Sequence, residues 1–209
     1  MNTIPAIQCV NTFKSNQLNN QHTSYMPITI DNYHKLDSTL RRGAKPTQAQ
    51  LQELKAHGVD IIISFCTNYN PHNPKAKTLP DEANWAEKLG MKFYWMPFRS
   101  KEDPLDSDIK KFFDITDRAR AEGKKVFIHC RHGADRTGVF AAMYRLRNQN
   151  AKLSDVIREL LRYGHDANHN QNIIPFIINF EKNLNPINKF IKMITNFLKQ
   201  QKIFLRFFK

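Results

Sequence analysis

The sequence contains few cysteines, and their spacing excludes two common roles for this residue. Its 209 residues include only Cys9, Cys66 and Cys130, which lie far apart along the chain. A disulfide framework uses an even set of cysteines in an oxidising compartment, whereas a structural zinc site uses closely spaced pairs. The odd, scattered set therefore favours a reducing compartment, and the sequence predicts no metal ion and no other cofactor.

Long apolar runs are also missing. No stretch approaches the roughly 20 apolar residues that a membrane-spanning helix needs. The first residues lack the basic and apolar regions of a signal peptide. These absences predict a cytoplasmic protein in the cell that makes it, with peripheral membrane association as an alternative. They leave secretion into another cell open.

Acidic residues are scarce relative to basic ones. The chain has 32 lysine and arginine residues against 19 aspartate and glutamate residues, with a formal charge of +13 and a pI near 9.8. Such a balance favours anionic partners, namely phosphorylated proteins, phosphoinositides or an acidic membrane surface. Nucleic acid is a weaker expectation because it depends on net charge alone, and we predict that it is not a partner.

No acidic residue follows Glu181, and residues 185–209 form a basic tail. Its apolar and its basic residues alternate at helical spacing: Ile187, Phe190, Ile191, Ile194, Phe197 and Leu198 among Lys189, Lys192, Lys199, Lys202, Arg206 and Lys209. This pattern predicts a basic amphipathic helix that lies on an anionic membrane surface. A terminal helix packed on the domain, with its lysines in solvent, is the alternative.

The stretch from Lys125 to Gly138 reads KVFIHCRHGADRTG and combines the elements of an anion site. Its apolar run, residues 126–128, predicts a buried strand, residues 131–135 predict a tight loop, and a helix is expected from Thr137 onward. Backbone N–H groups in such a loop point inward, and the helix dipole adds partial positive charge. The stretch therefore predicts a site for one phosphate group.

Each residue type in this stretch has a chemical task. Cys130 is the predicted nucleophile, because the same N–H groups and the dipole favour its thiolate. Arg136 presents a planar fork of donors that matches two phosphoryl oxygens. Gly133 suits a turn with positive φ, and Thr137 can donate its hydroxyl to the sulfur. His129 is expected to orient the loop by hydrogen bonding rather than to act as a base.

The whole loop is predicted to bind phosphate through its backbone and its charges. Arg131 and His132 add positive charge, which suits a multiply phosphorylated head group. The predicted phosphate-binding residues are Arg131, His132, Gly133, Ala134, Asp135 and Arg136.

This run resembles the signature of the cysteine-dependent protein tyrosine phosphatase superfamily: His-Cys, five residues, Arg, Ser/Thr. The Leu-Arg-Arg-Gly-Ala-Lys-Pro run at residues 40–46 resembles the R-G-x-x-P segment of its small dual-specificity-like members. The resemblance implies hydrolysis of phosphate monoesters, phosphotyrosine and also phosphoserine or phosphothreonine, through a phosphocysteine and without metal. A catalytically poor pseudophosphatase that docks on phosphorylated partners is the alternative from another class.

The resemblance also implies a general acid on a mobile loop after the strand that precedes the signature strand. Here that loop is residues 99–108, and Asp103, followed by Pro104, is the first candidate. Asp106 is expected to cap the next helix, Asp108 to lie in its first turn, and Glu102 is a further candidate.

Two more residues have alternative interpretations. Asp135 resembles the Asp-Arg-Thr ending of superfamily branches that act on phosphoinositides, and could orient Arg136 or hold a water. A phosphoinositide or inositol-phosphate phosphatase with the same catalytic residues is therefore the second functional hypothesis. Cys66 resembles a family cysteine that forms a reversible disulfide with the nucleophile, and the alternative is a buried, inert thiol.

Alternating apolar runs and helical patterns predict an α/β fold, with a central, mostly parallel sheet of four to five strands flanked by helices. The expected strands are residues 61–65, 92–98 and 125–129, with another near 26–30. The expected helices are residues 48–57, 81–89, 106–122, 137–148, 154–163 and 171–184. We expect a loosely ordered lead over residues 1–30, a phosphatase domain over 31–184 and the basic tail.

Overall fold

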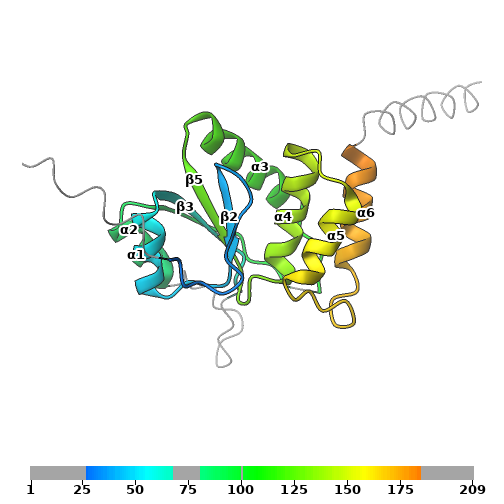
Figure 1. Ribbon diagram of the computed structural model, residues 1–209, viewed down its shortest axis with the longest axis horizontal. Helices are drawn as coiled ribbons and strands as arrows, with labels where there is room; N and C mark the ends of the chain where they lie inside the picture. Colours follow the sequence, from blue (N-terminus) through cyan, green and yellow to red (C-terminus); the bar gives the residue numbers. More distant parts are fainter. Residues whose placement is uncertain (1–26, 68–80, 100, 185–209) are drawn as a thin grey trace, which may run out of the picture.

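The computed structural model describes residues 27–67, 81–99 and 101–184, and these form an α/β domain around one five-stranded sheet (Figure 1). The strand order is β1-β2-β5-β3-β4, and every neighbouring pair except β1–β2 is parallel. The strands are β1 (His34–Lys35), β2 (Leu40–Gly43), β3 (Val59–Ser64), β4 (Lys92–Trp95) and β5 (Lys125–His129). The predicted mostly parallel sheet is confirmed.

Helices cover both faces of the sheet. On one face lie α1 (Gln48–Ala56) and α2 (Asp81–Lys88). On the other face lie α3 (Asp106–Ala121), α4 (Asp135–Asn148), α5 (Leu153–Arg162) and α6 (Ile173–Leu184). Because α4 packs between the sheet and the α5–α6 pair, all of its residues from Thr137 to Tyr144 are buried.

The central strands are buried on both faces because helices lie on both sides of them. In β3, Ile61 and Ile63 join the core beneath α3 and α4, whereas Ile62 joins the core beneath α1 and α2. Alternate side chains of a strand point to opposite faces, so a continuous apolar run fits a strand that packs on both sides. This explains why β3 and β5 could be predicted from sequence.

Helix ends follow the predictions at some positions and not at others. Thr47 caps α1 in a capping box with Gln50, and Gly58 (φ 78°) follows the end of that helix. The prediction that Asp106 caps α3 is wrong, because Asp106 is the first residue of that helix. The residue at the cap position is Leu105, whose side chain forms no capping hydrogen bond. Helix α4 begins at Asp135 rather than at Thr137.

Two further sequence expectations differ from the structure. Helix α5 begins at Leu153, one residue before the expected start at Ser154. Residues 27–30 contain no strand, yet Ile30 is buried against the core that α1 covers. The rest of the predicted lead and the basic tail over residues 185–209 lie outside the described residues. Among the residues described, no helix is both long and apolar enough to cross a bilayer.

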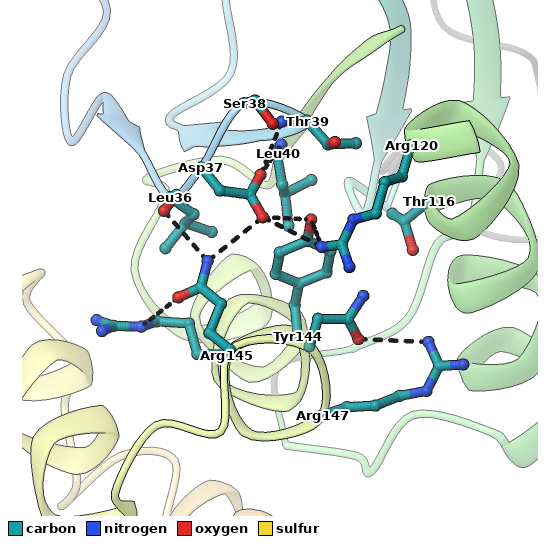
Figure 2. A network of polar contacts seen from close by, with 12 residues as sticks. Leu36, Asp37, Ser38, Thr39, Leu40, Thr116, Arg120, Tyr144, Arg145 and Arg147 are labelled. Carbon is teal, nitrogen blue, oxygen red and sulfur yellow. Dashed lines mark hydrogen bonds and ion pairs between the residues drawn. The ribbon is translucent and has the colours of Figure 1, made fainter. Parts of the chain in front are cut away.

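A cluster of polar contacts at Asp37 fixes the start of β2 (Figure 2). Oδ1 of Asp37 accepts hydrogen bonds from the amides of Thr39 (2.7 Å) and Leu40 (2.8 Å). Its Oδ2 accepts from the Tyr144 hydroxyl (2.8 Å) and from Nη2 of Arg120 (3.2 Å). The carboxylate therefore joins the turn before β2 to both α3 and α4.

Candidate active site

The predicted nucleophile lies at the carboxyl end of the parallel strand β5, shortly before α4. Strand β5 ends at His129, Cys130 follows it directly, and residues 131–134, here called the signature loop, lead into α4 at Asp135. Cys130 is 3% exposed and is a free thiol. The predicted strand–loop–helix arrangement is present, with the helix beginning two residues earlier than expected.

Burial and hydrogen bonding act in opposite directions on the Cys130 thiol. Burial alone would raise its pKa, but hydrogen bonds from the hydroxyl and amide of Thr137, the charge of Arg136 and the Gly133 amide together hold the pKa below its usual value. Thr137 is fully buried, so its hydroxyl is shielded from solvent where it acts on the thiol. These surroundings favour a thiolate.

The carbonyl groups of the signature loop all accept hydrogen bonds from groups around the loop. Asn32, which has a positive φ of 54°, reaches the loop from the segment before β1. The contacts are Lys45 N to Arg131 O (3.2 Å), Asn32 Nδ2 to His132 O (2.8 Å), Arg42 Nη2 to Gly133 O (2.6 Å) and Gly138 N to Ala134 O (2.7 Å). With the carbonyls engaged, the amides are the groups left to face an anion.

Glycine is required at position 133 by conformation and by space. Gly133 has φ 73°, which side chains rarely adopt. A Cβ atom there would lie 2.5 Å from the carbonyl carbon of Gly43 and 2.7 Å from the nitrogen of Ala44. The signature loop therefore lies directly against the end of β2, and the predicted positive φ is confirmed.

Arg136 joins the signature loop to two neighbouring segments. Its Nη1 donates to the carbonyl oxygens of Phe65 (2.9 Å) and Phe98 (3.3 Å). Phe65 follows β3, and Phe98 begins the loop that carries the predicted general acid. The guanidinium is thereby held beside Cys130, and it contributes to the lowered pKa of the thiol.

His129 forms a buried ion pair that sequence reasoning missed. Its Nε2 lies 2.7 Å from Oε1 of Glu82 in α2, and both side chains are completely buried. Burial would lower the pKa of His129, but the Glu82 carboxylate and Cys66 outweigh burial and raise it, so the imidazole is protonated at neutral pH. A glutamate among the buried alanines of α2, Ala83 and Ala86, was the available signal.

Cys66 lies beside this histidine. Its Sγ is 3.9 Å from Nδ1 of His129, and it is 7% exposed and not in a disulfide. The same Nδ1 is 3.3 Å from the carbonyl oxygen of Cys130. His129 therefore contacts both the Cys66 thiol and the backbone of Cys130, and its orienting role stays a prediction.

Of the acid candidates, Asp103 contacts another part of the domain. Its Oδ1 accepts a hydrogen bond from Nδ2 of Asn172 (2.9 Å), just before α6. Glu102 instead forms an exposed ion pair with Arg99 (3.7 Å). Asp106 and Asp108 lie in the first turn of α3, where they interact favourably with the helix dipole.

Asp135 has a partner that differs from the predicted one. Its Oδ1 lies 2.5 Å from Nδ1 of His165, which follows α5 and has a fully buried side chain. The carboxylate is thus oriented toward His165 rather than toward Arg136. Within the described ranges, no group of three or more histidine, cysteine, aspartate or glutamate side chains is placed to hold a metal ion.

Comparison with known proteins identifies the family of the domain that carries this site. Residues 42–183 match the family described as dual specificity phosphatase, catalytic domain. The chain belongs to this family. The dual specificity protein phosphatase TpbA of Pseudomonas aeruginosa strain UCBPP-PA14 is 26% identical over 133 residues, 64% of this chain and 55% of TpbA. The chain therefore spans about half the length of the curated relatives it matches.

Solved structures share the fold of this dual specificity phosphatase domain. The crystal structure of P. aeruginosa TpbA has a TM-score of 0.59 at 21% identity, covering 76% of this chain and 93% of TpbA. The crystal structure of PTPMT1 has a TM-score of 0.57 at 18% identity, covering 74% of this chain and 96% of PTPMT1. Both confirm the expected superfamily fold.

Proposed function

We propose that this protein hydrolyses phosphate monoesters through a phosphocysteine intermediate. The observation that carries the proposal is the buried Cys130 thiol, which is followed by a loop whose carbonyl oxygens all accept hydrogen bonds from around the loop; the lowered pKa of the thiol agrees with it. A buried thiol without catalytic surroundings has a raised pKa. Here the donors that lower it, from Thr137, Gly133 and Arg136, are also the groups that would bind a phosphoryl oxygen.

The first step transfers the phosphoryl group to sulfur. The Cys130 thiolate forms an S–P bond while the bond between phosphorus and the leaving oxygen breaks. Asp103 supplies the proton to that oxygen, and the guanidinium of Arg136 binds two of the equatorial oxygens as charge spreads over them. The hydrogen bond from Asn172 to Asp103 supports this choice of acid, because it fixes the carboxyl group.

The second step returns the enzyme to its starting state. Asp103, now a carboxylate, takes a proton from a water whose oxygen attacks phosphorus, and the S–P bond breaks. The Thr137 hydroxyl donates to the departing sulfur and stabilises it as a thiolate. The complete residue set argues against the pseudophosphatase alternative.

Phosphotyrosine is the proposed substrate, with phosphoserine or phosphothreonine as further possibilities. A structure of TpbA in complex with pTyr shares the fold, at a TM-score of 0.58. Phosphoinositides are the second candidate, because Arg131 and His132 are exposed at the signature loop and would attract a second phosphate. A structure of PTPMT1 in complex with PI(5)P also shares the fold, at a TM-score of 0.56.

Phosphate release from matched substrates would test this proposal. We expect release from a phosphotyrosine peptide at pH 5–7, less from a phosphothreonine peptide, and loss with Cys130→Ser. A preference for phosphoinositides over both peptides would favour the second candidate. It would also make the predicted membrane contact of residues 185–209 part of substrate binding, which deletion of that tail and liposome binding would check. Release that survives Cys130→Ser would contradict the mechanism.

The Cys66–Cys130 disulfide remains a proposal with its own test. Both thiols are free, and Nδ1 of His129 lies near the Cys66 sulfur and near the carbonyl oxygen of Cys130. Peroxide treatment followed by peptide mass spectrometry should yield a Cys66–Cys130 linked peptide and an activity loss that a thiol reductant reverses. Irreversible loss without that peptide would assign Cys66 as an inert core residue.

A further inference from the structure

Arg42 is a buried cation whose place in the core calls for an explanation. It lies in β2 opposite Ile128 of β5 and is 1% exposed. Burying a guanidinium costs free energy unless charges and acceptors surround it. Burial is also the main reason why the pKa of Arg42 falls to about 10. In the sequence, Arg42 is the arginine of the run that resembles the R-G-x-x-P segment, but its contact with the signature loop cannot be read from that run.

The shortest contact of Arg42 is with the signature loop. Its Nη2 donates to Gly133 O at 2.6 Å and lies 3.5 Å from Ala134 O. Its ion pair with Glu159 is longer, at 3.7 Å, and its guanidinium carbon lies 4.3 Å above the Tyr163 ring. The geometry therefore ranks the loop carbonyl above the carboxylate as the partner of this cation.

Glu159 does not depend on Arg42 for its charge balance. It also forms an ion pair with Arg145 of α4. An arginine that served only to neutralise Glu159 would duplicate that contact. By contrast, the carbonyl oxygen of Gly133 accepts its hydrogen bond, among the described residues, from Arg42.

This contact determines the direction of one backbone amide. A trans peptide group is planar, so its C=O and N–H point in opposite directions. Holding Gly133 O on the outer side of the loop therefore turns the N–H of Ala134 to the inner side. The preceding peptide shows the same relation: Asn32 holds His132 O, and the N–H of Gly133 hydrogen bonds to the Cys130 sulfur.

We propose that Arg42 is a positioning residue, which fixes the Gly133–Ala134 peptide so that the Ala134 N–H faces the phosphoryl group and the thiolate. This inference rests on the proposed phosphatase function. The positive charge of Arg42 also interacts with the Cys130 sulfur, since Cys130 is among the charges that act on Arg42. Arg42 does not touch the reacting atoms, and its effect passes through the signature loop.

Arg41 is a matched control for this inference. It is the neighbouring residue of the same strand, is 5% exposed, and donates through Nη1 to Ser38 O (2.8 Å). Successive side chains of a strand point to opposite faces, so Arg41 lies on the face away from Arg42. Arg41→Met removes an equally buried arginine of β2 that makes no described contact with the signature loop.

The experiment compares Arg42→Met, Arg42→Lys and Arg41→Met with the wild-type chain. The readouts are kcat for the best phosphomonoester found, inhibition by orthovanadate, and the pH midpoint of Cys130 alkylation by iodoacetamide, followed by peptide mass spectrometry. For Arg42→Met we expect a fall in kcat on the order of 10- to 100-fold, since one oriented donor is lost. We expect orthovanadate to inhibit this variant more weakly by a comparable factor. The pH midpoint of Cys130 alkylation should rise by about one pH unit, which is a tenfold change in ionisation.

The control and the conservative variant should behave differently. Arg41→Met should stay within about twofold of the wild type in all three readouts, and Arg42→Lys, which keeps one donor, should lie between wild type and Arg42→Met. An Arg42→Met protein with the kcat and alkylation midpoint of Arg41→Met would overturn the inference. If Arg42→Met does not fold, Arg42→Lys decides by the same comparison.

The failure of the proposed function would be recognised separately. A wild-type chain that hydrolyses no phosphomonoester would contradict the function, whereas the alkylation midpoint of Cys130 requires no substrate. An active wild type with an unmoved midpoint in Arg42→Met would contradict only the role of Arg42.

Discussion

The two ends of β2 carry opposite kinds of polar cluster. Just before the start of β2, the Asp37 carboxylate accepts hydrogen bonds from the turn, α3 and α4, at the edge of the sheet opposite to Cys130. At its end, the Arg42 guanidinium donates to the signature loop that surrounds the thiol. The comparison separates two uses of a polar group in one strand: the first joins elements to one another, and the second orients atoms for chemistry.

Gly133→Ala should have the largest effect and should affect both stability and activity. The new Cβ would lie 2.5 Å from the backbone of Gly43, and φ is 73°. We expect kcat to fall on the order of a thousandfold, because the loop amides move. We also expect the free energy of unfolding to fall by about 2–4 kcal/mol, because the conformation is strained and the contact is closed. Steady-state kinetics and urea unfolding of the same preparation would show both changes.

Asp103→Asn should affect activity alone. The amide keeps the shape and the acceptor for Asn172 but donates no catalytic proton, so kcat for a phosphotyrosine peptide should fall about 100-fold. For p-nitrophenyl phosphate, whose leaving group needs less protonation, the loss should be smaller. Equal losses for both substrates would assign the acid to another group, with Asp106, Asp108 and Glu102 as the next variants.

Asp37→Asn should show the reverse behaviour. The variant loses the ion pair with Arg120 and places an amide among donors, so the free energy of unfolding should fall by about 2 kcal/mol. Because Cys130 and the signature loop are not among its contacts, kcat should stay within about twofold. Urea unfolding and kinetics measure the two quantities, and a tenfold fall in kcat would break the comparison between the two ends of β2.

The effect of Asp37→Asn should also depend on pH. Burial would raise the pKa of Asp37, but hydrogen bonds from Leu40, Tyr144 and Thr39 outweigh it and lower the pKa. Because the pKa of Asp37 is lower in the folded state, its carboxylate stabilises the protein at pH values above the unfolded pKa of about 3.9. This contribution is lost as the pH falls through the folded pKa. The stability difference between wild type and Asp37→Asn should therefore be full at pH 6 and smaller at pH 3. A difference that is constant from pH 6 to 3 would contradict the carboxylate as its source.

The sequence predicted the parts of the molecule that are local. The signature from His129 to Gly138 is contiguous, and β3 and β5 are continuous apolar runs, so the fold and the surroundings of Cys130 could be predicted. Helix starts were less predictable where no side chain caps the helix, as at Asp135 and Leu153.

The contacts that complete the site come from distant parts of the chain. Glu82 reaches His129, His165 reaches Asp135, Asn172 reaches Asp103, and Arg42 reaches Gly133. Each pair forms only when strands and helices pack, and the sequence signals at most the buried position of one partner, as at Glu82 in α2. Arg42 lies within the run that resembles the R-G-x-x-P segment, but its partner could not be read from that run.

The outward hydrogen bonds of the signature loop have a consequence for the timing of its motions. Its donors come from β2, from the segments before β1 and after β2, and from the first turn of α4, so the loop can open only if it separates from the sheet. A local opening that requires a larger unit to unfold costs the unfolding free energy of that unit. Trypsin cleavage after Arg131 should therefore require the same opening as cleavage within β5, although residues 131–134 belong to no helix or strand.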